Sequence, residues 1–139
     1  MFRTDLISIY IDRPFAPVYD FLVDPANLLR WMPSLGPVLR HVSGNEWVAE
    51  NPHWPPGPLM LRFTPRNRYG VLDVVTTSAR MGILTTPCRL VHNGLGCEII
   101  YLLRQFTGLS DEAFASEQEW LRSDLLALKT LLEATLAAP

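Results

Sequence analysis

The sequence predicts an α+β fold in which a curved antiparallel sheet of seven strands wraps around one long C-terminal helix. Three observations support this prediction. A β-branched segment near the N-terminus is followed by two short helical segments, the middle of the chain alternates apolar and polar residues between turn residues, and a long amphipathic segment closes the chain. Antiparallel strands with helices gathered on one side define the α+β class.

The first strand and the two short helices are predicted from local signals. Residues 6–11 are largely β-branched or aromatic and are bounded by aspartates, which is typical of a strand. Pro14 or Pro17 opens the first helix, because proline is tolerated in the first helical turn. Asp24 fits an N-cap that is followed by a proline, so a second short helix begins there and ends before Pro33.

Six further strands are expected in three hairpins. The proline-rich segment 51–58 separates the first two hairpins and cannot be a ladder strand, because proline has no amide hydrogen to donate. Asn93 and Gly94 are expected as the two loop residues of the third hairpin, since this pair is the strongest short hairpin signal. The predicted strands are 38–42 with 46–50, 59–64 with 69–77, and 83–91 with 97–106.

The third hairpin has two faces of different polarity. With this loop, Arg89 faces Glu98, so opposite charges meet across the ladder on a face that we expect in solvent. Cys88 and Cys97 are placed diagonally, which disfavours a disulfide. Tyr101 supplies the one strongly polar group of the other face, which should point inward. The inward face consists of Cys88, Leu90, Cys97, Ile99, Tyr101 and Leu103.

The closing helix is predicted over residues 111–136. Ser110 can cap its N-terminus, and acidic residues follow in the first turn, where the helix dipole favours them. At about 1.5 Å per residue the helix is about 39 Å long, enough to cross the whole sheet. An apolar stripe should face the core and consists of Phe114, Leu121, Leu125, Leu128 and Leu132.

Three stretches of the chain carry a resemblance to a known superfamily. They are IYIDRP at 9–14 with VYDFLVD at 18–24 and WMP at 31–33, YGVLD at 69–73 through VHNGLGCE at 91–98, and DL at 124–125 with LKTLLE at 128–133. In these stretches the chain resembles the SRPBCC, or START-like, superfamily. The resemblance implies the helix-grip fold of START lipid-transfer domains, polyketide cyclases and birch-pollen-allergen-like proteins, with a single domain over residues 1–139 and a cavity between the sheet and the helix. These stretches are signatures of a fold and not of a catalytic site.

Composition excludes several classes of protein. With 139 residues, 48% of them hydrophobic and 19% charged, the chain suits one domain and is not disordered. A formal net charge of −2 argues against nucleic-acid binding, which needs clustered basic charge. No apolar run approaches the roughly 20 residues that span a bilayer. Asp5 interrupts the N-terminus before an apolar signal segment could form, so we expect a cytoplasmic protein.

Motifs for common chemistry are absent from the sequence. There is no G-x-S-x-G nucleophile elbow, no P-loop and no G-x-G-x-x-G dinucleotide fingerprint. The three histidines, His41, His53 and His92, lack the spacing of metal ligands. We therefore expect neither a cofactor nor a metal ion.

The second hairpin brings two opposite charges to one face. With residues 65–68 as its turn, Met60 faces Asp73, and Arg62 lies diagonal to Asp73. Facing inward, an Arg62–Asp73 pair would orient a ligand carboxylate or hydroxyl. Facing outward, it is a surface salt bridge that contributes about 0–1 kcal/mol. Alternation leaves both orientations open, because the opposite face of the hairpin is at least equally apolar.

The first hairpin is open to two registers. A three-residue loop pairs His41 with Trp47, whereas a two-residue loop pairs Val42 with Trp47 and turns Arg40 inward, since a slip of one residue exchanges the two faces. In both registers Trp47 faces inward, and either Arg40 or His41 enters the cavity. Only His41 would act as a general acid or base near neutral pH.

The tryptophans are spread over four predicted elements that should surround one space. We expect Trp47 and Trp120 to fill the core. Trp54 lies in the stiff proline-rich loop at the surface, so we expect it at the rim of the cavity or in a lid. The predicted ligand-binding residues are Trp31, Trp47, Trp54, Asp73, Tyr101, Leu121 and Leu125.

Three functions are compatible with the predicted fold. The favoured hypothesis is the binding of a small hydrophobic molecule, such as a lipid, an isoprenoid or an aromatic polyketide. The alternative is a polyketide cyclase or dehydratase with an acid–base group in the same cavity, so enzymatic activity stays open. The third is an interaction protein with a filled pocket and a functional dimer surface, and a homodimer is compatible with the sequence. Catalysis would be favoured if Arg62, Asp73, Tyr101 and His41 converge, whereas a filled pocket predicts no cavity beyond a water or two.

Overall fold

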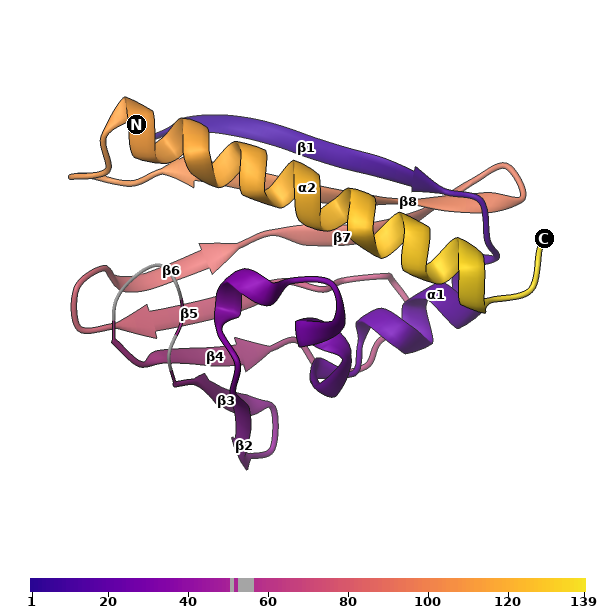
Figure 1. Ribbon diagram of the computed structural model, residues 1–139, viewed down its shortest axis with the longest axis horizontal. Coiled ribbons are helices and arrows are strands. Elements are labelled where there is room, and N and C mark those ends of the chain that lie inside the picture. The colour runs from indigo at the N-terminus through magenta and orange to yellow at the C-terminus, as the bar shows by residue number, and fades with distance from the viewer. Residues whose placement is uncertain (51, 53–56) are drawn as a thin grey trace.

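The computed structural model describes residues 1–50, 52 and 57–139, and the predicted α+β class is confirmed in them (Figure 1). Strands dominate the middle of the chain, and the long helix closes it. The elements are β1 (Arg3–Ile11), α1 (Phe15–Leu22), η1 (Pro25–Arg30), η2 (Pro33–Leu35), β2 (Leu39–Ser43), β3 (Glu46–Ala49), β4 (Leu59–Phe63), β5 (Val74–Ser78), β6 (Gly82–Thr86), β7 (Cys88–Asn93), β8 (Gly96–Gln105) and α2 (Asp111–Thr135). The elements η1 and η2 are short 3-10 helices.

The strands form two antiparallel sheets that share one bent stretch of chain. One sheet has the strand order β1-β8-β7, and the other has the order β2-β3-β4-β5-β6. Only Pro87 separates β6 from β7, so the strand predicted at 83–91 is divided there and the described residues hold eight strands instead of seven. Proline has no amide hydrogen for a ladder bond, although its carbonyl still accepts the amide of Leu102 at 3.1 Å.

An aspartate side chain completes the hydrogen bonding at this division. The backbone amide of Cys88 donates to the carboxylate of Asp73 at 2.9 Å, and the guanidinium of Arg89 binds the same carboxylate oxygen. On the same side of the strand, the amide of Leu72 donates to the carbonyl of Cys88 and the amide of Leu90 donates to the carbonyl of Gly70. The stretch around Asp73 therefore joins the two sheets.

The predicted register of the second hairpin is wrong. Met60 lies opposite Thr77 instead of Asp73, because the loop runs from residue 64 to residue 73 and not only over 65–68. The side chain of Asn67 holds this larger loop through two hydrogen bonds. Its amide nitrogen donates to the carbonyl of Val71, and its oxygen accepts the backbone amide of Val71. The register differs by an even number of residues, so the side chains predicted to share a face still share it.

The third hairpin also differs in register from the prediction. Gly94 and Leu95 form the loop, so Arg89 lies opposite Ile100 and the predicted pairing with Glu98 is wrong. Gly94 has φ +60°, which suits the first central position of a type II′ turn, whereas a loop at Asn93 would require positive φ at a residue other than glycine. The face composition is unchanged, and the predicted inward residues Cys88, Leu90, Cys97 and Ile99 are buried.

The first hairpin adopts the pairing of His41 with Trp47, followed by a bulge at Val42. Both Arg40 and His41 are exposed, so the expectation that one of them enters the cavity is wrong. Arg40 binds Glu50 at 2.7 Å, and the ring of His41 hydrogen-bonds the carbonyl of Gly44.

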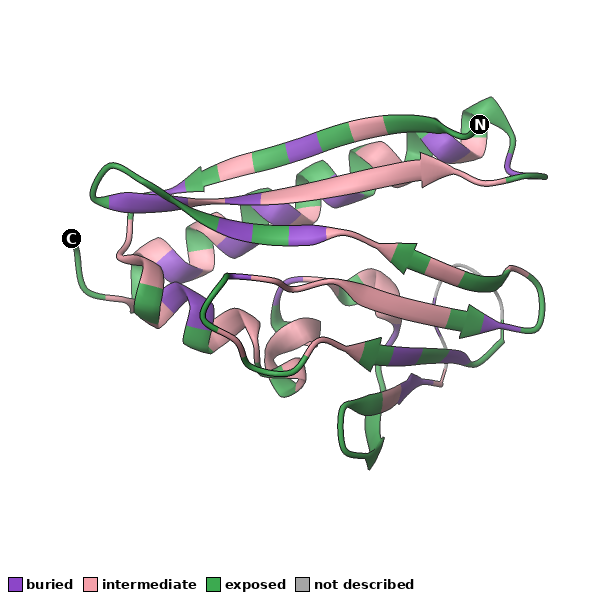
Figure 2. Ribbon diagram, turned by 180° about the vertical axis from the view of Figure 1, so that it is seen from behind, coloured by how far each residue is buried: buried purple, intermediate pink, exposed green. Residues whose placement is uncertain are grey.

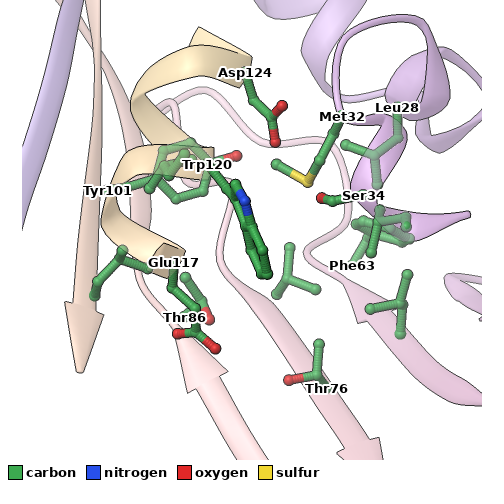
Figure 3. Close-up of a pocket in the computed structure, with 15 residues that line it drawn as sticks. Leu28, Met32, Ser34, Phe63, Thr76, Thr86, Tyr101, Glu117, Trp120 and Asp124 are labelled. Atoms are coloured by element: carbon green, nitrogen blue, oxygen red, sulfur yellow. The ribbon is translucent and has the colours of Figure 1, made fainter. Parts of the chain in front are cut away.

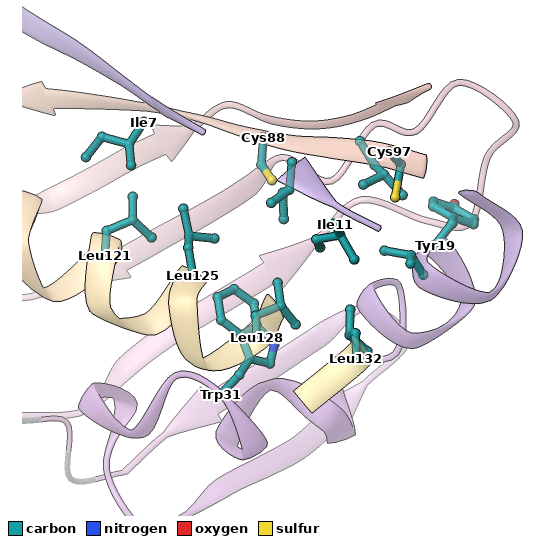
Figure 4. Packing of buried hydrophobic residues seen from close by; sticks show 13 residues of the cluster. Ile7, Ile11, Tyr19, Trp31, Cys88, Cys97, Leu121, Leu125, Leu128 and Leu132 are labelled. Atoms are coloured by element: carbon teal, nitrogen blue, oxygen red, sulfur yellow. The ribbon is translucent and has the colours of Figure 1, made fainter. Parts of the chain in front are cut away.

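The core lies between α2 and the three-stranded sheet (Figure 2). Ser110 caps α2 as predicted, because its hydroxyl accepts the amide of Ala113 at 3.1 Å. The whole predicted stripe of α2 is buried, and Figure 4 shows Leu121, Leu125 and Leu128 facing the strands. The helix packs on β1 and β8 and runs along them, instead of crossing the whole sheet as its length suggested (Figure 1).

The C-terminal end of α2 is fixed to the end of β1. The amide of Asp12 donates to the carboxylate of Glu133 at 2.8 Å, and Lys129 donates to the carbonyl of Tyr10. The guanidinium of Arg13 donates to the backbone carbonyls of Glu133 and Leu136 at the C-terminal end of α2. These contacts hold α2 over β1 while the second sheet diverges from it.

We predict that Gly70→Ala is much more destabilising than Gly44→Ala. Both glycines have positive φ, which costs alanine about 1–2 kcal/mol. At Gly70 a Cβ would also overlap the carbonyl oxygen of Leu90, whereas at Gly44 it meets open space. Urea unfolding should show a loss of about 3 kcal/mol or more for Gly70→Ala and about 1 kcal/mol for Gly44→Ala. Equal losses would contradict the close contact with β7.

We also predict that Asp73→Ala lowers the free energy of unfolding by about 1–3 kcal/mol, because the buried amide of Cys88 loses its acceptor. Asp73→Asn retains an acceptor oxygen and should lose less. The control is Asp20→Ala, which breaks an ion pair with Arg66 whose two side chains are each 62% exposed, and its expected effect is below about 1 kcal/mol. A loss for Asp73→Ala no larger than for this control would show that the carboxylate does not support the junction.

Candidate functional site

A cavity of about 230 Å³ lies between α2, the two short helices and the concave face of the sheets (Figure 3). Its volume is close to that of about eight liquid waters, so the pocket is not filled by the protein. The lining is mostly apolar. It comprises Leu28, Met32, Ser34, Leu35, Leu61, Phe63, Val74, Thr76, Thr86, Tyr101, Leu103, Glu117, Trp120, Leu121 and Asp124.

The short helices close the side of the cavity that α2 leaves open. Asp24 caps η1 by accepting the amide of Ala26 at 3.0 Å, with Pro25 at the first helical position. The turns that follow present Leu28 and Met32 to the cavity from the side opposite α2. Residues 24–33, whose short helix was predicted from local signals, therefore form one wall of the site.

Strand alternation supplies the floor of the cavity. Leu61 and Phe63 of β4 face inward with Val74 and Thr76 of β5, while the intervening residues face outward. This inward face is the one opposite to the Arg62–Asp73 face. Arg62 and Asp73 therefore face outward. The salt bridge of Asp73 is with Arg89 and not with Arg62.

The cavity opens to the surface beside Trp120, which is 47% exposed. An adjoining depression of about 410 Å³ shares Ser34, Trp120 and Asp124 with the cavity. Figure 3 shows Trp120 and Asp124 projecting from α2 toward the segment that carries Met32 and Ser34. Ser34, Trp120 and Asp124 therefore form the mouth.

At the inner side, the hydroxyl of Tyr101 is hydrogen-bonded to the thiol of Cys88, which lies directly opposite it in the ladder. Burial raises the pKa of Tyr101 well above its ordinary value and raises the pKa of Cys88 to about 12. Both groups are therefore neutral at physiological pH. Tyr101 can hydrogen-bond a ligand, and Cys88 is not a ready nucleophile, because a thiol attacks as the thiolate.

Asp124 in the lining titrates near neutrality. Burial raises its pKa to about 6, because a partly desolvated carboxylate is less stable in its charged form. It makes no hydrogen bond or ion pair with any residue that the structure describes. An unpaired carboxyl at the mouth of an apolar cavity can bind a cation or a hydrogen-bond donor, or transfer a proton.

The residues predicted to bind a ligand lie in several different places. Tyr101 and Leu121 line the cavity, and Trp31 lines a small adjoining space of about 30 Å³ that also reaches Tyr101. Leu125 is buried in the core between α2 and the three-stranded sheet. Trp47 packs in a second apolar cluster around Ala49, Leu59 and Leu61, while Asp73 faces outward at the junction of the sheets. Trp54 and His53 lie outside the described residues.

Sequence reasoning missed the helix face that forms the mouth. Trp120 was expected in the core, but it is exposed and lines the cavity. Glu117, Trp120, Leu121 and Asp124 recur at i, i+3, i+4 and i+7, which places them on one helix face. This mixed face lies beside the apolar stripe, and its spacing was a signal in the sequence.

The four residues whose convergence would have favoured catalysis do not come together in the structure. His41 is exposed, and Arg62 and Asp73 line a depression on the outward face, so of the four residues only Tyr101 borders the cavity. Among residues 1–50, 52 and 57–139 no cluster of three His, Cys, Asp or Glu side chains is arranged to hold a metal ion. In the same part of the chain, no helix has the length and apolar character required to cross a membrane.

No protein-family model matches the sequence, and no curated protein matches it. Solved structures match the fold. An uncharacterised protein from Bacillus thuringiensis superposes with a TM-score of 0.75 at 14% identity, over 94% of this chain and 99% of that one. Ara h 8.0201 gives 0.68 at 13% identity, over 97% and 100%. DynU16, a protein in the dynemicin biosynthetic locus, gives 0.69 at 12% identity, over 94% of this chain and 47% of that one.

The resemblance to the SRPBCC, or START-like, superfamily is confirmed at the level of the fold. The chain shares with these structures the helix-grip arrangement of an antiparallel sheet and a long C-terminal helix. Identities of 12–14% show a common fold and leave the function to be argued from the site.

We predict that Asp124→Asn stabilises the protein at neutral pH and not in acid. The pKa of Asp124 is raised from 3.8 to about 6 in the folded protein, so ionisation of this carboxyl lowers the free energy of unfolding. Below about pH 4 the carboxyl is protonated in both the folded and the unfolded protein, and this loss of stability is absent. The loss grows as the pH rises to about 6. Thermal unfolding of both proteins from pH 4 to pH 7.5 should show a Tm difference that grows with pH in favour of the variant. A Tm difference that stays constant with pH would contradict a raised pKa at Asp124.

Proposed function

We propose that the protein binds a small hydrophobic molecule in the cavity between the sheets and α2. The observation that carries this proposal is the apolar cavity of about 230 Å³, with a few polar groups in its lining and a mouth at the surface. Ligand sites typically combine an apolar lining with a small number of polar groups that fix orientation.

The size of the cavity limits the ligand. Pockets for drug-sized molecules have volumes of roughly 300–1,000 Å³. At about 230 Å³ this cavity suits a small ring system, or one end of a longer molecule whose remainder extends past Trp120 into the adjoining depression. The hypothesis of a filled pocket does not account for a space of this size.

A polyketide cyclase or dehydratase is the second candidate function, and Asp124 is the observation that favours it. A carboxyl group with a pKa of about 6 can give or accept a proton near neutral pH. The presence of a structural neighbour in the dynemicin biosynthetic locus also supports a role in biosynthesis. Binding is the better supported function, because His41, Arg62 and Asp73 face away from the cavity, and of the four residues whose convergence would favour catalysis only Tyr101 borders it.

We predict that Thr86→Phe abolishes binding while Thr85→Phe does not. The two residues are neighbours in β6, but Thr86 lines the cavity and Thr85 is exposed on the outward face. Phenylalanine at position 86 would occupy the cavity instead of a packed core, so a smaller loss of stability is expected than the 1–3 kcal/mol typical of overpacking.

The neutral dye N-phenyl-1-naphthylamine, whose fluorescence rises in apolar sites, gives the measurement. Its affinity should fall at least about tenfold in Thr86→Phe, a loss of about 1.4 kcal/mol or more, and stay within about twofold of the wild type in Thr85→Phe. Mass spectrometry of molecules extracted from the purified protein should identify a hydrophobic compound that is depleted in Thr86→Phe. Equal dye binding by the two variants would overturn the assignment of the cavity as the binding site.

A further inference from the structure

The charged side chains among the described residues of the cavity lining are all acidic. Glu117 and Asp124 both line it from α2, and no lysine, arginine or histidine is among the described residues of the lining. By contrast with Asp124, six carboxylates elsewhere on the chain form ion pairs with lysine or arginine. These six are Asp5, Asp20, Glu50, Asp73, Glu119 and Glu133.

The surroundings of Asp124 contain no compensating charge in the described structure. Tyr101 faces it from β8 with a neutral hydroxyl, and Ser34 faces it from η2 with another. On its own helix the neighbours in the lining are Trp120 and the acidic Glu117. A carboxylate that is partly removed from water without a partner is unfavourable, and a ligand cation would relieve this cost.

Resting on the proposed function, we infer that the ligand is a hydrophobic amine: its apolar body fills the cavity, and its protonated nitrogen lies at the mouth between Asp124 and the indole of Trp120. The nitrogen would form a charge-assisted hydrogen bond with the carboxylate. Trp120 adds a second attraction, because the face of an indole ring binds cations, and tryptophan does so best among the aromatic residues. Its exposed position at the mouth leaves that face accessible to a ligand.

The same charges disfavour another class of hydrophobic ligand. A carboxylate-bearing molecule, such as a fatty acid, would bring a second negative charge toward Asp124 in a partly desolvated space, where like charges repel more strongly than in water. A neutral alcohol of the same shape would keep the apolar contacts and lose the charge pairing. The order of affinity is therefore amine, then alcohol, then carboxylate.

Three matched compounds test this order by calorimetry at pH 7.5. They are 2-(1-naphthyl)ethylamine, 2-(1-naphthyl)ethanol and 1-naphthylacetate, which share one ring system and differ in charge. The amine should bind the wild type at least about tenfold more tightly than the alcohol, a difference of about 1.4 kcal/mol, and the carboxylate should bind most weakly. Amine affinity should also fall as the pH is lowered from 7.5 to 5, because Asp124 becomes protonated, while alcohol affinity stays nearly constant.

Two variants identify the residue responsible. Asp124→Asn should weaken the amine at least about tenfold and leave the alcohol within about twofold. Glu119→Gln removes the same charge from the same helix at a side chain that is 76% exposed and outside the cavity lining, so it should leave all three affinities unchanged. Trp120→Leu supplies an independent test, since it retains an apolar side chain and should weaken the amine more than the alcohol.

The outcomes separate this inference from the proposed function. If the alcohol binds as tightly as the amine, and Asp124→Asn and Trp120→Leu affect both compounds equally, the cavity binds hydrophobes without a preference for cations, and the inference is overturned while the proposed function stands. If none of the three compounds binds the wild type and the dye does not distinguish Thr86→Phe from Thr85→Phe, the proposed function fails, and the inference fails with it.

Discussion

The division of one long strand at Pro87 is the constraint on which the rest of the structure depends. Pro87 cannot donate a ladder hydrogen bond, and the following amide, of Cys88, donates to the Asp73 side chain instead of to a neighbouring backbone. Residues before Pro87 pair with β5, and residues after it pair with β8. One stretch of chain therefore belongs to two sheets, and these can diverge without leaving the buried amide unsatisfied.

The cavity follows from this divergence. α2 buries its apolar stripe on β1 and β8, and the contacts of Arg13 and Lys129 fix its C-terminal end there. The helix thus packs on the three-stranded sheet. The short helices η1 and η2 cover the side of the cavity that lies opposite α2. The bulky apolar residues of this short chain consequently form both a packed core and the walls of an open site.

The polar groups of the site fall into two kinds. At the inner side, Tyr101 and Cys88 satisfy each other and are kept neutral by burial, so they set shape and hydrogen bonding. At the mouth, Asp124 is ionised at neutral pH and has no partner among the described residues, so it determines which ligand charge is accepted. The cavity therefore has a neutral inner side and an anionic opening.

Elements with local signals could be predicted from the amino-acid sequence. The first strand, the cap at Asp24, the cap at Ser110 and the buried stripe of α2 were all predicted, because the periodicity and capping that specify them lie within one segment. The alternation of residues in the third hairpin also identified its inward side chains Cys88, Leu90, Cys97 and Ile99, although its register was wrong. The register of the second hairpin, the outward position of Asp73 and the place of Asp124 at the mouth became clear only in the folded chain. These depend on contacts between residues distant in the chain, such as Gly70 with Leu90 and Asp73 with Cys88, and no local pattern encodes which distant partner a backbone group will find.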